Sequence, residues 1–170
     1  LGSWPMPLAI YWRTPEGQML PDQARQRIAD GLGLLGTACG KLGDEAQGEE
    51  VLRLAVQYAQ DGSSAGKIFL RLGTMFLEGS RHGEAIGPLR RANALADGDK
   101  DVLSEVMPAL MSAYMKRGKP VSAFAVLLEA EAAGLSAKVL KTQRGLIHER
   151  LGAKAKKWRK LVSQASAAGA

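Results

Sequence analysis

The sequence has little that could cross-link it, bind a metal or cross a membrane. It contains one cysteine, Cys39, and two histidines, His82 and His148. A single thiol cannot close an internal disulfide, which excludes the small disulfide-stapled secreted folds and the cysteine-rich metal sites. No apolar run approaches the roughly 20 residues that a bilayer-spanning helix requires. The chain is therefore expected to fold on an apolar core alone.

What is present is the composition of an ordinary globular domain. Apolar residues make up 46% of the chain and charged residues 24%, values that exclude a disordered or fibrous protein. A length of 170 residues corresponds to one domain. The formal net charge is +6 and the isoelectric point is near 9.6, which mildly favours acidic partners.

Three segments of the chain differ in amino-acid composition. Residues 1–3 resemble the remnant of a cleaved expression tag and are set aside. Residues 4–21 carry four prolines, a density that prevents a continuous helix, and we interpret them as an extended arm. Tyr11 and Trp12 in this arm are expected to dock on the helical domain or on a neighbouring chain, because such apolar side chains are unfavourable in water. Residues 22–168 form the predicted helical-repeat domain.

From residue 22 onward, short apolar runs at helical spacing are separated by glycine-containing turns. The predicted turns lie at residues 41–44, 61–63, 78–80, 97–99, 117–119 and 151–152. No segment alternates apolar and polar residues with the period of two that is typical of a β-strand. The sequence therefore predicts an all-α fold.

The strongest pattern is an internal repeat. Aligned segments place Gly36, Gly73, Met111 and Gly145 at equivalent positions, at successive intervals of 37, 38 and 34 residues. Periods of this length are typical of helical-hairpin repeats. In the second unit, Gly73 is expected to meet Ala85 of the following helix, so that the two backbones approach closely.

The second unit resembles the tetratricopeptide repeat (TPR) family at nearly every expected position. The residues that carry the resemblance are 69–76, Ala85, Leu89 and Ala92. The resemblance extends over about residues 25–152, and the fourth unit departs from it because Lys157 stands where a small residue is expected. It implies a right-handed α-solenoid of antiparallel helix hairpins, with about three repeats and a C-terminal capping hairpin. The implied function is a protein–protein interaction module, such as a scaffold, an assembly factor or a secretion-type chaperone.

The resemblance also implies a binding site. TPR domains bind partner segments in a concave groove that is lined by the first helix of each hairpin. The equivalent positions are Leu34, Thr37, Leu70, Arg71, Thr74, Leu77, Ala109, Ser112, Met115, Lys116, Leu146 and Arg150. These residues predict an apolar groove with basic edges. Such a groove suits a helix or an extended apolar segment with acidic flanks.

The last predicted helix, residues 153–168, combines an apolar stripe with a basic patch. The stripe consists of Ala155, Trp158, Leu161, Val162 and Ala165, and it is expected to pack on the preceding hairpin. The basic patch consists of Lys154, Lys156, Lys157, Arg159 and Lys160. Charges on a terminal helix usually form the solvated face of a cap. The alternative is attachment to an acidic partner, an anionic lipid surface or a nucleic acid. Nucleic acid is disfavoured because Trp158 is the only aromatic residue there and the core needs it.

Motifs for catalysis or cofactor binding are weak. Residues 31–36 match the G-x-G-x-x-G dinucleotide fingerprint, but a helical pattern rather than a strand precedes them. Residues 97–101 place carboxylates at alternate positions, as a calcium loop does, but Val102 and Pro108 stand where that loop requires glycine and glutamate. Residues 97–101 are therefore expected to form a turn that caps the next helix. We expect no enzymatic activity, no cofactor and no metal.

Two further hypotheses are alternatives to partner binding in the groove. In one, the chain is a self-assembling scaffold whose arm docks on a neighbouring copy. In the other, the basic patch attaches the chain to an acidic partner or surface. The favoured partner is a peptide or helix segment of another protein, and nucleic acid is the least favoured. The sequence does not fix the compartment. We expect a soluble protein of the bacterial cytoplasm or periplasm, or the soluble part of a longer or anchored protein.

Overall fold

The computed structural model describes residues 21–168, which contain helices and turns but no β-strand. The helices are α1 (Asp22–Lys41), α2 (Glu45–Tyr58), α3 (Gly62–Glu78), α4 (His82–Leu95), α5 (Lys100–Lys116), α6 (Pro120–Ala132), α7 (Ala137–Leu151) and α8 (Ala153–Ala168). The all-α prediction is confirmed. The expectations for the tag remnant and for the docking of Tyr11 and Trp12 lie outside the described residues. No helix within residues 21–168 has the length and apolar content needed to cross a bilayer.

Local sequence explains where several helices begin. Asp44, Asp61 and Asp99 each precede a helix and accept hydrogen bonds from backbone N–H groups of its first turn. Ser136 does the same for α7. Pro120 opens α6, at a position where its missing N–H would have no intrahelical partner. The cap formed by Asp99 is the helix-capping turn that the sequence predicted.

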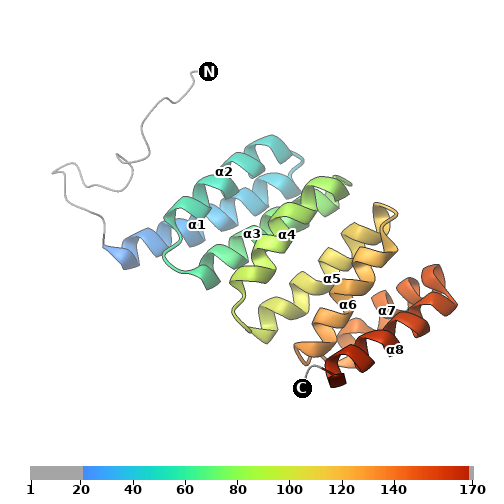
Figure 1. Ribbon diagram of the computed structural model, residues 1–170. Helices are drawn as coiled ribbons and strands as arrows, with labels where there is room; N and C mark the ends of the chain where they lie inside the picture. The colour runs from blue at the N-terminus through green and yellow to red at the C-terminus, as the bar shows by residue number, and fades with distance from the viewer. Residues whose placement is uncertain (1–20, 169–170) are drawn as a thin grey trace.

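Consecutive helices pack against each other along the whole described chain, and they follow one another from one end of the molecule to the other (Figure 1). In addition, α1 contacts α3, α3 contacts α5, and α5 contacts α7. No two even-numbered helices share a comparable contact within residues 21–168. The odd-numbered helices therefore form one continuous layer.

Glycines allow the helices of the first two pairs to approach closely. A Cβ atom on Gly73 would lie 2.6 Å from Cγ of Leu89 and 3.5 Å from the carbonyl oxygen of Ala85. Gly73 thus meets the second helix of its own pair, as predicted, with Leu89 as its nearest neighbour. In the first pair two glycines face each other, because a Cβ atom on Gly48 would lie 2.8 Å from the carbonyl oxygen of Gly36.

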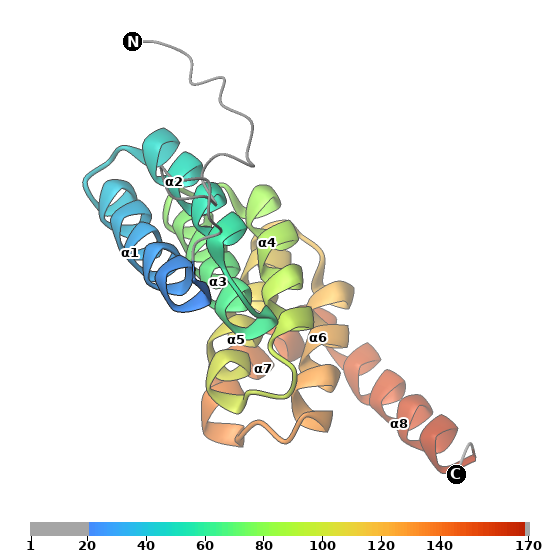
Figure 2. The ribbon, with the colours of Figure 1, turned by 90° about the vertical axis from the view of Figure 1, so that its left-hand side faces the viewer.

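This close approach is not repeated between α7 and α8. A Cβ atom on Gly145 would meet nothing within 4 Å, so the close contact that the sequence predicts in the second pair is absent from this one. Lys157 occupies the place of the small residue in the second helix, and it is exposed. α8 projects away from the other helices (Figure 2).

The apolar stripe of α8 is only partly buried. Ala155 is fully buried and Trp158 packs against the core, whereas Leu161 and Val162 are about half exposed. The side chain of Ala165 lies outside the described residues. The stripe was expected to pack along its whole length, and it does so only in its first half because α8 leaves the stack.

Candidate functional site

Two hollows open on the layer of odd-numbered helices. The first hollow has a volume of about 450 Å³ and is bordered by α1, α3 and the start of α5. The second hollow has a volume of about 690 Å³ and lies between α5 and α7. No even-numbered helix contributes a residue to either hollow. We refer to the two hollows together as the groove.

Most of the predicted groove residues line these hollows. Those in the first hollow are Thr37, Leu70, Arg71 and Thr74. Those in the second hollow are Ser112, Met115, Lys116, Leu146 and Arg150. The remaining three, Leu34, Leu77 and Ala109, line neither hollow. Leu34 is exposed on α1, while Leu77 and Ala109 are partly buried against the core.

The first hollow holds charges of both signs. Its cations are Lys41, Lys67 and Arg71, from α1 and α3. Its carboxylates are Glu78 at the end of α3 and Asp99, Asp101 and Glu105 at the start of α5. Within residues 21–168 no ion pair joins the two sets. Apart from Asp99, whose carboxylate caps α5, these charges are therefore available to a ligand.

Sequence reasoning missed these carboxylates, because it assigned Asp99 and Asp101 only to a capping turn. Helical spacing contained a signal that would have located two of them. Asp101 and Glu105 lie eight and four residues before the predicted groove position Ala109, so helical periodicity places them on the same side of α5.

Arg71 is positioned at the wall of the first hollow by a chain of hydrogen bonds. Its Nη1 donates to Oγ1 of Thr37 at 3.5 Å, and the Thr37 hydroxyl donates to the carbonyl oxygen of Gly33 at 2.8 Å. A guanidinium group has five N–H donors, so this contact leaves most of them for a ligand. A carboxylate or a backbone carbonyl of a partner segment would suit them.

The second hollow is an apolar surface with charged edges. Met115 and Leu146 supply apolar surface, and the flexible thioether of Met115 adapts readily to different ligand shapes. The charged residues of this hollow are the two cations Lys116 and Arg150 and the carboxylate of Glu149. The hollow is therefore net positive and suits an apolar segment with an acidic neighbour.

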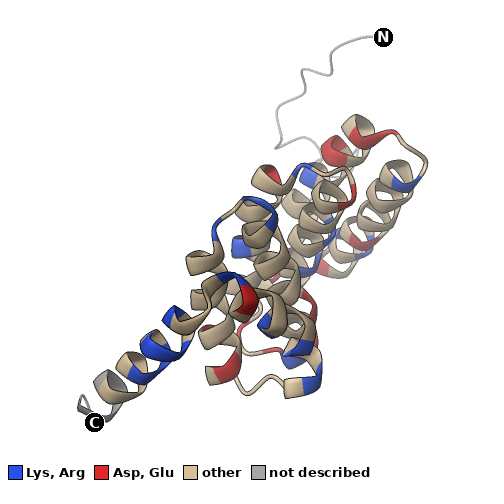
Figure 3. Ribbon diagram, turned by 90° about the vertical axis from the view of Figure 1, so that its right-hand side faces the viewer, with Lys and Arg blue, Asp and Glu red and all other residues tan. Residues whose placement is uncertain are grey.

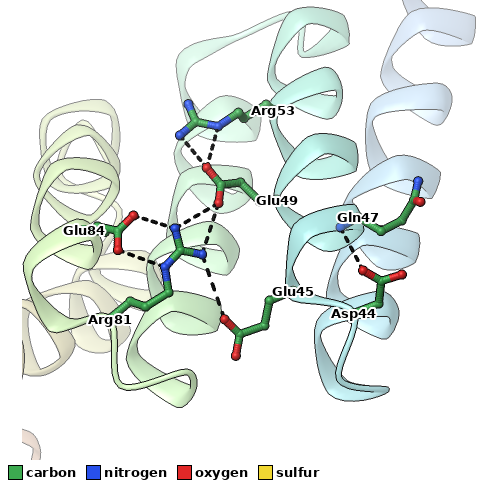
Figure 4. Close-up of polar contacts among 7 residues, drawn as sticks. All are labelled: Asp44, Glu45, Gln47, Glu49, Arg53, Arg81 and Glu84. Carbon is green, nitrogen blue, oxygen red and sulfur yellow. Dashed lines mark hydrogen bonds and ion pairs between the residues drawn. The ribbon is translucent and has the colours of Figure 1, made fainter. Parts of the chain in front are cut away.

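Outside the groove, Arg81 joins α2 to the start of α4 (Figure 4). Its guanidinium forms ion pairs with Glu49 at 3.2 Å, with Glu45 at 3.9 Å and with Glu84. It also lies 4.3 Å above the centre of the Phe76 ring. The hydrogen bond from Arg81 lowers the pKa of the Glu84 carboxyl, and the same bond raises the pKa of Arg81. This cluster links the first two helix pairs.

Replacing Arg81 by methionine should lower the melting temperature by about 2 to 4 °C at low salt, because the ion pairs are partly exposed and each is worth little. Since the folded-state pKa of Glu84 is lowered, its contribution is present at neutral pH and is lost as the pH falls through that pKa. The difference between parent and variant should therefore shrink in acid and in high salt. Thermal denaturation followed by circular dichroism measures this difference in melting temperature.

Arg81→Lys, which keeps the charge but loses the forked geometry, should have a melting temperature between those of the parent and Arg81→Met. Equal melting temperatures of parent and Arg81→Met at low salt would contradict this role.

Lysine and arginine residues are frequent along α8 (Figure 3), and the members of the basic patch differ in exposure and pairing. Its exposed members are Lys154, Lys156, Lys157 and Lys160. Arg159 instead pairs with Glu131 of α6, with an Nη1–Oε2 distance of 3.0 Å. Arg144 of α7 pairs with the same carboxylate at 2.7 Å. Arg159 therefore helps to anchor α8 rather than to extend the exposed basic surface.

The residues that the sequence offers for nucleotide binding, metal binding or thiol chemistry lie in positions where they contribute to the fold. Residues 31–36 lie inside α1 and not between a strand and a helix. His148 packs edge-on against Phe124, with ring centroids 6.2 Å apart, and Cys39 is half-buried on α1. Within residues 21–168, no three His, Cys, Asp or Glu side chains are grouped so that they could hold a metal ion.

Comparison of the chain with protein-family models, with curated proteins and with solved structures found no match. The groove is therefore interpreted from its own geometry and chemistry.

Proposed function

We propose that this protein is an interaction module that binds a segment of another protein in the groove, without catalysis and without a cofactor. The observation that carries the proposal is that both hollows open on the same layer, formed by odd-numbered helices alone. Such a layer is the surface that a TPR-like stack offers to a peptide or helix. The proposed architecture is a right-handed α-solenoid of three TPR-like hairpins with a capping hairpin. The recurring contacts between successive odd-numbered helices support it.

The chemistry of the two hollows defines the proposed partner segment. Apolar side chains of the partner pack on Met115 and Leu146 in the second hollow, beside an acidic residue held by Lys116 or Arg150. The first hollow offers carboxylates of α3 and of the start of α5 as well as the cations of α1 and α3. The partner therefore carries basic as well as acidic residues beside its apolar stretch, whereas the sequence alone suggested acidic flanks. Charges of this kind set the orientation and the association rate more than the affinity.

Site-specific photo-crosslinking in the source cells tests the proposal. A benzophenone amino acid is placed at Leu146 in the second hollow, at Thr74 in the first, and at the control position Val121, which is exposed on α6. We expect the two groove positions to form an adduct with the same polypeptide and the control to form none. Adducts that are identical at all three positions, or a lack of adducts in the groove, would contradict groove binding.

A groove variant sharpens this test. Leu146→Glu should weaken the adduct formed from Thr74 about tenfold or more, because a carboxylate placed against apolar partner surface loses its hydration. The fold should be intact, since Leu146 is half exposed. Circular dichroism of the purified variant provides that control.

A second candidate function is attachment through the basic patch, which is favoured by its exposed lysines. None of Lys156, Lys157 and Lys160 forms an ion pair within residues 21–168. Replacing all three by glutamate should leave the adduct from Leu146 unchanged if the groove binds the partner. Loss of that adduct, together with partner binding that weakens steeply as salt rises, would instead identify the basic patch as the active surface.

A further inference from the structure

α1 carries an apolar side that no described helix covers. Ile28 and Leu35 lie seven residues apart on one side of the helix, and Leu42, the residue directly after its end, follows at the same interval; all three are exposed. Between them, Gly31 leaves open space, since a Cβ atom there would meet nothing within 4 Å. We call the side formed by these four residues the outer face of α1. The core contacts of α1 are made from its opposite side, through Ala29, Gly33 and Gly36.

The equivalent face is buried wherever a helix pair precedes. In the repeat alignment Leu35 corresponds to Leu72 of α3 and to Leu110 of α5. Leu72 is 2% exposed and Leu110 is 1% exposed, whereas Leu35 is 53% exposed. α3 packs on α1 and α2, and α5 packs on α3 and α4, but no described element precedes α1. The outer face of α1 is therefore an interface whose other half is not among the described residues.

We infer that residues 4–20 of the same chain cover the outer face of α1. This segment joins α1 directly, through Pro21. Leu35 lies about 20 Å along the helix from its first residue, since a helix rises about 1.5 Å per residue. The stretch from Trp12 to Pro21 spans up to about 30 Å when extended. Trp12 is therefore close enough in the chain to fold back onto Leu35.

The composition of the segment matches the face it would cover. It holds two of the three tryptophans of the chain, Trp4 and Trp12, together with Ile10 and Tyr11. Flat aromatic side chains suit the shallow strip at Gly31 between larger aliphatic residues. The prolines of the segment restrict its backbone before it docks, which lowers the entropy lost on docking.

Tethering favours this occupant over a second copy of the chain. A segment joined to its binding face by a few residues has an effective concentration of about a millimolar. A second copy at micromolar concentration would have to compete with that value through a much larger contact. The proposed contact is therefore within one chain, and it is independent of what the groove binds.

Tryptophan accessibility in the full chain tests the inference. Trp158→Phe leaves Trp4 and Trp12 as the only tryptophans, and their emission and their quenching by iodide are measured. We expect blue-shifted emission and weak quenching. Leu35→Asp in the same background should shift the emission to the red and increase the quenching several-fold. The matched control is Val121→Asp, at a similarly exposed aliphatic position on α6, which should change neither.

Sedimentation of the same samples separates the outcomes. Protected tryptophans in a monomer, exposed by Leu35→Asp and not by Val121→Asp, support the inference. A dimer that Leu35→Asp dissociates would show that a second copy covers the face, and would overturn it. Tryptophans that are equally accessible in all three proteins, or equally protected, would also overturn it. If Leu35→Asp lowers the helix content, Leu42→Asp replaces it, because Leu42 is 87% exposed.

Discussion

Replacing Phe124 by alanine is expected to lower the free energy of unfolding by about 3 to 5 kcal/mol, the usual effect of removing a buried phenylalanine. Phe124 is fully enclosed on α6. Its ring lies 6.2 Å from the ring of His148 on α7 and 6.2 Å from that of Trp158 on α8, measured between centroids. One side chain thus joins three helices, and the cavity left by its loss would be shared among all of them.

Urea unfolding followed by circular dichroism measures this effect, and Trp158 fluorescence reports the same site. The control is Val121→Ala, one turn earlier on α6, where the side chain is exposed. This change should alter the stability by no more than about 0.5 kcal/mol. If Phe124→Ala and Val121→Ala unfolded at the same urea concentration, the packing of α7 and α8 on Phe124 would be refuted.

The second large effect is expected at Gly48. Gly48→Ala should lower the free energy of unfolding by about 1 to 3 kcal/mol, although alanine favours a helix over glycine by about 1 kcal/mol. The new methyl group would lie 2.8 Å from the carbonyl oxygen of Gly36 and 2.9 Å from Sδ of Met75. The methionine side chain is able to move aside, but the backbone carbonyl moves only if α1 and α2 separate.

Gly145→Ala provides the opposite expectation with the same chemical change. Gly145 lies inside α7 and a Cβ atom there would meet nothing within 4 Å, so only the helix preference acts, and the variant should be more stable by about 0.5 to 1 kcal/mol. Both variants are compared by urea unfolding. Two glycine-to-alanine changes that shift stability in the same direction would rule out the backbone contact between α1 and α2.

The helical organisation could be predicted because the turns carry strong local signals. Glycines at positive φ, such as Gly43, Gly98 and Gly118, end their helices where the sequence predicted turns. The turn that contains Gly134, between α6 and α7, was not among the predicted ones, although its φ of 75° is equally typical. Alanine and leucine residues on both sides of Gly134 continue the helical pattern and obscure the break.

The groove was harder to predict than the helices. Repeat positions indicate which side of a helix faces the groove, and Arg71, Met115 and Leu146 do line its hollows. They do not indicate how far a neighbouring helix covers a side chain. Leu77 was selected for the groove by its repeat position, but its side chain is partly buried against the core. The carboxylates of the first hollow, which are Glu78, Asp99, Asp101 and Glu105, were not among the repeat positions selected for the groove.

The strength with which α8 is attached to the other helices determines which part of the protein unfolds first. Ala155 and Trp158 pack against the core and Arg159 pairs with Glu131, whereas Leu161 and Val162 are about half exposed. The other helices share one continuous core. Detaching α8 therefore requires less free energy than global unfolding, and it occurs as a local, reversible opening. In the open form the lysine-rich segment 154–160 is accessible to proteases, so that the lifetime of the chain depends on the equilibrium of this one helix more than on the stability of the core.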